Sequence, residues 1–344
     1  MGKMTGYLAD NPDFKKFLDK ISDMTGDTNK TVWRKNLLKN ADLFKKSGWA
    51  CPELQDKEVG RAAIIIGASP ALAKQVDTLR DIQHDPRFVL CGLSCNLEYL
   101  LNNAIQPKYC ITVDADASQG DFWKNIDMEQ TKGITLIAST LAYPPMLKEW
   151  KGPLHFIALC TDDKELIKIH KERYGLINGN GQEFISLMGQ YNVMTAFAFM
   201  VLGCSILMFV GNEMSFKDKE ARYYVDRDDP RDHLGRGKQG DIYGNIVYTT
   251  TGLLALKLAL EFFLEMISGA GWFFNCTEAG IFGVTKRFKD RQIPWIKQLT
   301  LKNGIAQARH IMATGKPLYS YSPGSIVSVP YVERGIIQAI GVHQ

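Results

Sequence analysis

Two acidic residues spaced two apart, Asp114 and Asp116, directly follow the apolar run Tyr109–Val113. In an extended segment the side chains of residues i and i+2 point to the same side, so we expect both carboxylates on one face. Such a pair can bind Mg²⁺ together with phosphate oxygens, and we predict Asp114 and Asp116 as Mg²⁺ ligands. Asp114 can instead act as the general base that accepts a proton from an acceptor hydroxyl. A helix N-cap and a surface acid are the plain structural alternatives.

A turn of small residues, Gly67, Ala68, Ser69 and Pro70, ends the apolar run Ala62–Ile66. Proline suits the first turn of a helix, and Ser69 is of a type that caps helices. The unpaired N–H groups of a helix start attract phosphate, so we expect these four residues to bind the phosphates of a nucleotide. The turn matches neither a GxGxxG nor a Walker A motif, and an ordinary βα turn is the structural alternative.

Further polar residues follow other apolar runs in the same way. We predict that Glu213, beside Asn212, binds an acceptor hydroxyl as a second catalytic carboxylate. Thr277 and Glu278 have the alternative of capping the helix that follows them. The remaining nucleotide-binding predictions, each made from this position after an apolar run, are Asn96, Asp116, Ser139, Asn212, Thr277 and Glu278.

The elements that must position these residues are short apolar strands that alternate with helices. This alternation predicts an α/β fold with a Rossmann-like, mainly parallel sheet and helical additions at both ends. In such sheets ligands bind beyond the carboxyl ends of the strands, where the predicted site residues would gather. The expected strands are 62–66, 88–91, 109–113, 134–138, 154–159, 206–210 and 272–275, and the clearest helices are 190–202 and 252–267.

Changes in composition divide the chain into three parts. Residues 1–57 are Lys-rich and helix-like, which predicts an N-terminal helical cap. We expect 58–285 to form a Rossmann-like nucleotide-binding domain, and 286–344 to form a basic, helical C-terminal extension. A long polar stretch at about 214–248 is typical of a lid. Arginines in this lid can clamp a diphosphate or pair with neighbouring aspartates: Arg222, Arg227, Arg231 and Arg236.

The bulk composition excludes several classes of protein. The 344 residues carry a net charge of +4, and no nucleic-acid-binding motif is present. Seven cysteines without a CxxC pair indicate reduced thiols and a cytoplasmic protein. Met1–Asn11 lacks the apolar core of a signal peptide, and Val193–Val210 is interrupted by Thr195 and Gly203, so we expect no membrane span. The sequence leaves the oligomeric state open, a homo-oligomer included.

Four motifs in order carry a family resemblance: GASPAL, VLCGLSCNLEYLLNNAIQPKYCITVDAD, NVMTAFAFMVLGCSILMFVGNEMSF and NCTEAG. Over about 61–283 the chain resembles the MptE-like group, which includes archaeal 6-hydroxymethylpterin diphosphokinases and the central domain of Maf flagellar glycosylation factors. The layout is also similar to that of bacterial sialyltransferases. Three places depart from the family pattern: Glu213 stands in place of a shorter acid, Tyr191-Asn192 in place of a Gly-Ser pair, and Ala279 in place of a glycine.

The resemblance implies a transferase that holds a nucleotide by its phosphates, with Mg²⁺ as the expected cofactor. The expected function is glycosyl transfer from a nucleotide-sugar donor. Diphosphate transfer from ATP to a pterin-like hydroxymethyl acceptor is the alternative, and a non-catalytic scaffold that keeps the fold is the second alternative. A glycan, a protein, a nucleic acid and a small molecule all stay open as the acceptor.

Overall fold

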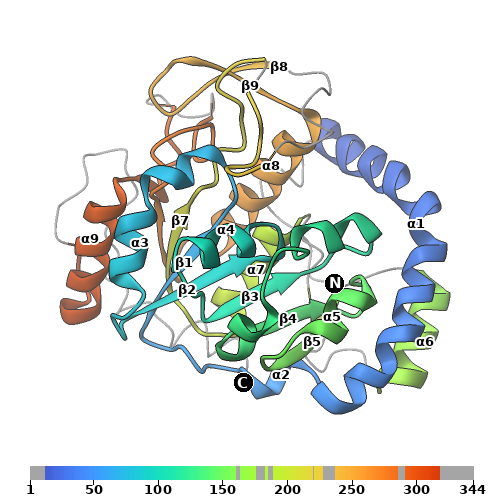
Figure 1. Ribbon diagram of the computed structural model, residues 1–344. Helices are drawn as coiled ribbons and strands as arrows, with labels where there is room; N and C mark the ends of the chain where they lie inside the picture. The colour runs from blue at the N-terminus through green and yellow to red at the C-terminus, as the bar shows by residue number, and fades with distance from the viewer. Residues whose placement is uncertain are drawn as a thin grey trace.

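The computed structural model has a nine-stranded, fully parallel sheet within its described residues (Figure 1). The strand order is β11-β10-β7-β1-β2-β3-β4-β5-β6. The prediction of an α/β fold with a Rossmann-like, mainly parallel sheet is therefore confirmed. The structure describes residues 12–159, 163–175, 183–184, 189–219, 221–227, 237–285 and 291–317, and only the backbone of 12–29, 52 and 183–184.

The strands form where β-branched and aromatic residues run without a polar interruption, as in a sheet covered on both faces. All five residues of β1, for example, are buried. The parallel strands are β1 (Ala62–Ile66), β2 (Phe88–Leu93), β3 (Tyr109–Thr112), β4 (Thr135–Ser139), β5 (Leu154–Leu159), β6 (Glu183–Phe184), β7 (Ile206–Val210), β10 (Trp272–Asn275) and β11 (Ile296–Gln298). A separate antiparallel hairpin pairs β8 (Gly237–Gly240) with β9 (Ile246–Thr249).

Helices cover both faces of the sheet. The α-helices are α1 (Pro12–Ser47), α2 (Ala50–Glu53), α3 (Val76–Ile82), α4 (Leu97–Asn102), α5 (Pro144–Glu149), α6 (Lys164–Tyr174), α7 (Gln190–Met200), α8 (Thr251–Met266) and α9 (Leu301–Thr314). The short 3-10 helices are η1 (Pro70–Lys74), η2 (Ser94–Asn96), η3 (Ala117–Phe122) and η4 (Met128–Gly133).

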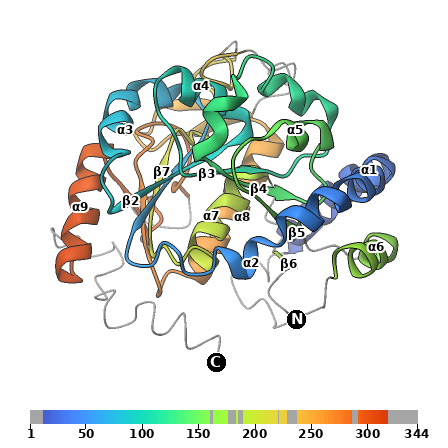
Figure 2. The ribbon, with the colours of Figure 1, turned by 60° about the horizontal axis from the view of Figure 1, so that its bottom comes forward.

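The central strands separate two apolar clusters because successive side chains of a strand point to opposite faces. Ala63 and Ile65 of β1 pack with α7 and α8, whereas Ile64 and Ile66 pack with α3 and α9. Figure 2 shows α3 and α9 side by side, with α7 and α8 together elsewhere against the strands. Because the strands are parallel, their carboxyl ends lie along the same edge of the sheet.

The α1 helix is fixed to the sheet by apolar and polar contacts. Leu37 and Ala41 share an apolar cluster with β4 and β5. The buried Asn40 amide donates to the carbonyls of Thr140 and Ala142 at 3.0 and 2.8 Å, just beyond β4. This helix therefore closes the loops at one end of the sheet.

The sheet continues past residue 285, where the sequence analysis places the start of a separate extension. β11 pairs with β10, and α9 packs on the cluster that contains α3. β11 escapes a pattern search because it has only three residues. Of the predicted cap, lid and extension, the stretches 1–11, 228–236, 286–290 and 318–344 lie outside the described residues.

Two properties of the described chain bear on the setting of the protein. No helix in the described ranges combines the length and the apolar character that crossing a bilayer requires. The six cysteines that the structure describes are free thiols.

Candidate functional site

The point where the order of strands along the chain reverses, the topological switch point, lies between β1 and β7. From β1 the chain proceeds to β2 and β3 on one side, and later places β7 and β10 on the other. The turn after β1 and the turn after β7 therefore adjoin, which is where open parallel sheets bind ligands. Gly67 allows this approach, because a Cβ atom at this position would overlap the Gly211 carbonyl. The predicted phosphate turn thus occupies the topological switch point.

Two N–H groups here, one from the turn and one from the residue after it, have partners within the protein. Ser69 N donates to the Gly211 carbonyl at 3.0 Å, and Ala71 N donates to Glu213 Oε1 at 2.6 Å. The Ser69 side chain does not cap η1; instead its Oγ accepts from Glu213 N at 3.4 Å. The Glu213 carboxylate is buried, and burial raises its pKa. Glu213 therefore faces the turn as an internal acceptor, a contact invisible from sequence spacing.

Two buried amides, from Asn96 and Asn212, adjoin the same turn. Asn96 Nδ2 donates to the carbonyls of Ile66 and Gly67, both at 2.8 Å, so this side chain fixes the end of β1. Asn212 N donates to Thr277 Oγ1 at 3.1 Å. Its Nδ2 is buried and has no hydrogen-bond partner among the residues that the structure describes. Asn96 and Asn212 therefore lie at the switch point, the first with its amide bound to the turn.

The Asp114 carboxylate is exposed, and Gln190 connects it to Ser94, the first residue of η2. Asn96, the last residue of η2, binds the end of β1. Gln190 Nε2 donates to Asp114 Oδ2 at 2.6 Å, while Gln190 Oε1 accepts from Ser94 N and Ser94 Oγ at 3.2 and 2.8 Å. Ser94 N can only donate a hydrogen bond, so the Gln190 atom that faces it must be the amide oxygen. The NH₂ group of Gln190 therefore faces Asp114. Gln190 is not among the residues predicted from the sequence. Its place as the first residue of α7, a helix that starts at this edge, is the signal that could have found it.

Asp116 lies at the outer rim of the edge. Its carboxylate caps η3 by accepting from Ser118 N at 2.8 Å, and this hydrogen bonding lowers its pKa. No group of three or more Asp, Glu, His or Cys side chains suited to a metal occurs among the described residues. Asp114 and Asp116 fit a Mg²⁺ ion only as a two-carboxylate site completed by other oxygens, such as those of phosphate.

The remaining predicted residues make local contacts. Ser139 is the last residue of β4, and its Oγ accepts from Leu141 N at 3.1 Å, which turns the chain after the strand. Glu278 Oε1 accepts from Leu301 N at 3.1 Å, so this carboxylate caps the start of α9. Ser139 therefore lies apart from the switch point, three strands away from β1. Glu278 follows β10, the strand next to β7.

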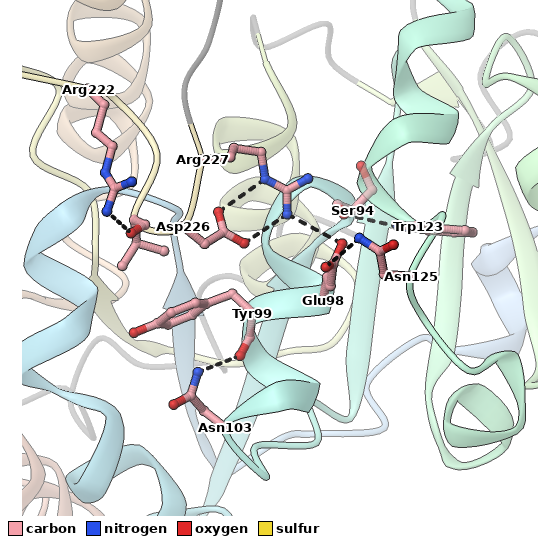
Figure 3. Close-up of polar contacts among 10 residues, drawn as sticks. Ser94, Glu98, Tyr99, Asn103, Trp123, Asn125, Arg222, Asp226 and Arg227 are labelled. Carbon is pink, nitrogen blue, oxygen red and sulfur yellow. Dashed lines mark hydrogen bonds and ion pairs between the residues drawn. The ribbon is translucent and has the colours of Figure 1, made fainter.

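Part of the predicted lid, residues 221–227 and here called the strap, closes over the first turn. Val225 N donates to the Ala68 carbonyl at 2.8 Å. Figure 3 shows the Arg227 guanidinium between Asp226 and Glu98. Arg227 Nη2 lies 2.8 Å from Asp226 Oδ2 and 3.7 Å from Glu98 Oε2. The same guanidinium stacks over Phe122, 5.1 Å from the ring centroid. Of the lid arginines, Arg227 is thus held by several partners, whereas Arg231 and Arg236 lie outside the described residues.

Strained backbone marks the ends of β7 and β10. Five described non-glycine residues have positive φ, and two of them, Met214 at 54° and Glu278 at 60°, stand there. Such conformations persist where the surrounding structure imposes them, and they concentrate at functional sites.

A comparison with protein-family models identifies the family. The model described as 6-hydroxymethylpterin diphosphokinase MptE-like matches residues 35–219, just over half of the chain. The chain belongs to the MptE-like family. The match includes β1, the first turn, Asp114 and Glu213, so the switch point lies within the MptE-like part. A search of curated proteins finds no match.

The fold of this MptE-like chain is also similar to a solved structure described as MAf glycosyltransferase from Magnetospirillum magneticum AMB-1. The TM-score is 0.56 with 15% sequence identity, over 82% of this chain. The similar region makes up 42% of the other protein, so the chain spans less than half of its length. At 15% sequence identity, this likeness shows that the two proteins share a fold.

Proposed function

We propose that this protein is a glycosyltransferase that moves a sugar from a nucleotide-sugar donor to an acceptor hydroxyl. The observation that carries the proposal is the exposed Asp114 carboxylate, which Gln190 orients beyond the carboxyl end of β3 in an MptE-like sheet. The fold likeness to a glycosyltransferase, over 82% of the chain, supports sugar as the transferred group.

In the proposed mechanism Asp114 accepts the proton of the acceptor hydroxyl while that oxygen attacks the sugar. The Gln190 NH₂ group holds the carboxylate in position through Oδ2. In this proposal the donor phosphates lie at the first turn. Arg227 of the strap would neutralise the charge that develops on the leaving phosphate after giving up its ion pairs with Asp226 and Glu98. Where Asp114 is a metal ligand rather than the base, it and Asp116 would hold Mg²⁺ together with phosphate oxygens, and the ion would supply further neutralisation.

Diphosphate transfer from ATP is the second candidate, because the matching family model is described as a diphosphokinase. Diphosphate transfer would use the same residues. Asp114 would be the carboxylate beside the acceptor hydroxyl, and Arg227 the cation beside the departing phosphate. The non-catalytic alternative is supported by one contact, since Glu213 already occupies the Ala71 N–H group.

The three candidates differ in what the purified protein binds and consumes. We expect CMP, CDP, UDP or GDP at millimolar concentration to raise the melting temperature, because a ligand of the native state stabilises it by mass action. Incubation with matching nucleotide sugars should then release free nucleotide. Conversion of ATP to AMP with a hydroxymethyl acceptor would favour the diphosphokinase, and no shift with any nucleotide, with or without Mg²⁺, would favour the scaffold.

The variant Asp114→Asn tests the assigned base. We expect turnover to fall about 10²- to 10⁴-fold, the usual contribution of a general base, while nucleotide affinity stays unchanged. Asp121→Asn is the matched control and should keep full turnover, because Asp121 is an exposed aspartate of η3 to which no role is assigned. Loss of nucleotide binding in Asp114→Asn would instead identify this residue as a metal or donor ligand.

A further inference from the structure

The tip of the β8–β9 hairpin is a rigid turn that belongs to the predicted lid. Asp241 is buried, and its Oδ1 accepts from Tyr243 N at 2.9 Å and from Asn245 N at 2.7 Å. Asp241 N also donates to the Asn245 carbonyl at 2.9 Å. Three hydrogen bonds across five residues fix the backbone here, so the side chains of the tip have defined positions.

This rigid turn presents a large aromatic side chain to solvent. Tyr243 is 68% exposed and Ile246 is 66% exposed, the two highest values among the large hydrophobic residues of the described chain. The Tyr243 hydroxyl donates to the Glu278 carbonyl at 3.3 Å, which directs the ring toward the end of β10. An ordered but uncovered aromatic ring is a ready contact surface for a flat ligand.

A continuous series of contacts joins this ring to the switch point. Ile242 N donates to the Gly280 carbonyl at 2.9 Å. Gly280 packs on the backbone of Glu213, and Ile281 N donates to the Glu213 carbonyl at 2.9 Å. Glu213 in turn accepts from Ala71 N of the first turn. The Tyr243 ring therefore stands at the rim of the candidate site, on the β10 side. In Figure 1, β8 and β9 lie at the top of the view.

We infer that the Tyr243 ring is the stacking surface for the base of the bound nucleotide. The inference rests on the proposed function, which puts the phosphates at the first turn; the base then extends across the end of β7 toward β10. Aromatic rings stack on nucleobases in a manner that tolerates different bases. Asp241 and Glu278 flank the ring with negative charge, so the uncharged base suits this position and the phosphates do not.

Binding measurements on the full chain with and without a base separate this contact from the phosphate contacts. Titration calorimetry with nucleoside diphosphates, and with pyrophosphate as the base-free probe, is carried out on wild type and variants in the presence of Mg²⁺. We expect Tyr243→Ala to weaken binding of the preferred nucleoside diphosphate about 5- to 100-fold, as for loss of one base–aromatic stack, and to leave pyrophosphate binding unchanged.

Two further variants sharpen the test. Tyr243→Phe keeps the ring and should retain the wild-type affinity, whereas Ile246→Ala removes the other exposed large hydrophobic side chain of the hairpin and should have no effect. Equal nucleoside diphosphate affinity in wild type and Tyr243→Ala would overturn the stacking role while leaving the proposed function in place. The stacking role would also be overturned if the wild type bound pyrophosphate at least as tightly as every nucleoside diphosphate, because the base would then add nothing to the affinity. A wild type that binds none of these probes would remove the proposed function and this inference together.

Discussion

Among single residues, Gly280 and its neighbour Ala279 show where the family glycines are needed. Gly280 has φ +83°, and a Cβ atom there would overlap the backbone of Glu213. Ala279, which stands where the family has a glycine, does not have positive φ. The glycine that this chain lacks is therefore at the position where a side chain fits the backbone.

The pair gives a matched stability test. We expect Gly280→Ala to lower the free energy of unfolding by at least about 2 kcal/mol, because it adds both strain and overlap. Ala279→Gly, which restores the family pattern, should cost about 1 kcal/mol or less through added freedom of the unfolded chain. Urea unfolding followed by circular dichroism measures both values, and equal losses in the two variants would contradict the argument.

Glu213 predicts a pH dependence of stability. Because burial raises its pKa in the folded state, the folded protein holds this proton more tightly than the unfolded chain does. Its contribution to stability is therefore complete below the pKa of the unfolded state and is lost as pH rises through the raised pKa. Glu213→Gln, which cannot ionise, should gain stability relative to wild type between pH 4 and pH 7, as measured by urea unfolding. A constant difference across this range would contradict the assignment.

At the scale of elements, α1 holds the sheet through buried amides rather than through apolar residues alone. Asn36 Nδ2 donates to the carbonyls of Ala115 and Leu141, and Asn40 Nδ2 serves the next pair, Thr140 and Ala142. One helix thus binds both the segment after β3, which contains Asp114, and the turn after β4.

Removal of one amide should be costly because it leaves buried carbonyls without a donor. We expect Asn40→Ala to lower the free energy of unfolding by about 1–3 kcal/mol. Lys39→Ala, at the exposed neighbouring position of the same helix, should change it by less than about 0.5 kcal/mol. Thermal unfolding of both variants provides the comparison, and an Asn40→Ala protein as stable as Lys39→Ala would show that water replaces the amide.

For the whole molecule, the contacts predict one cooperative unit. The apolar cluster of α1 includes residues of β4 and β5, and the clusters of the two faces share the strands of one sheet. We therefore expect a single urea transition, with tryptophan fluorescence and far-ultraviolet circular dichroism changing together. Separate transitions would show that the N-terminal helices unfold independently of the sheet.

The strands were predictable from sequence because their signal is local. The bounds of β1, β5, β7 and β10 coincide with the apolar runs, whereas β6 and β11 are too short, and β8 too polar, to show a period. The places of the candidate residues near the ends of strands were predictable, and their roles stay predictions. Their partners were not, because Glu213 reaches Ala71 only through the pairing of β7 with β1, strands far apart in the chain.

The contact between Glu213 and Ala71 has a consequence for affinity. A carboxylate attached to the protein acts as a competing ligand whose effective concentration is on the order of millimolar or more. An incoming phosphate that accepts from Ala71 N must displace it, so the measured affinity equals the intrinsic one multiplied by the fraction of molecules in which the carboxylate has left. The Ala71 N–H group is thereby screened from the dilute phosphates of the medium and open to a ligand whose remaining groups bind elsewhere in the site.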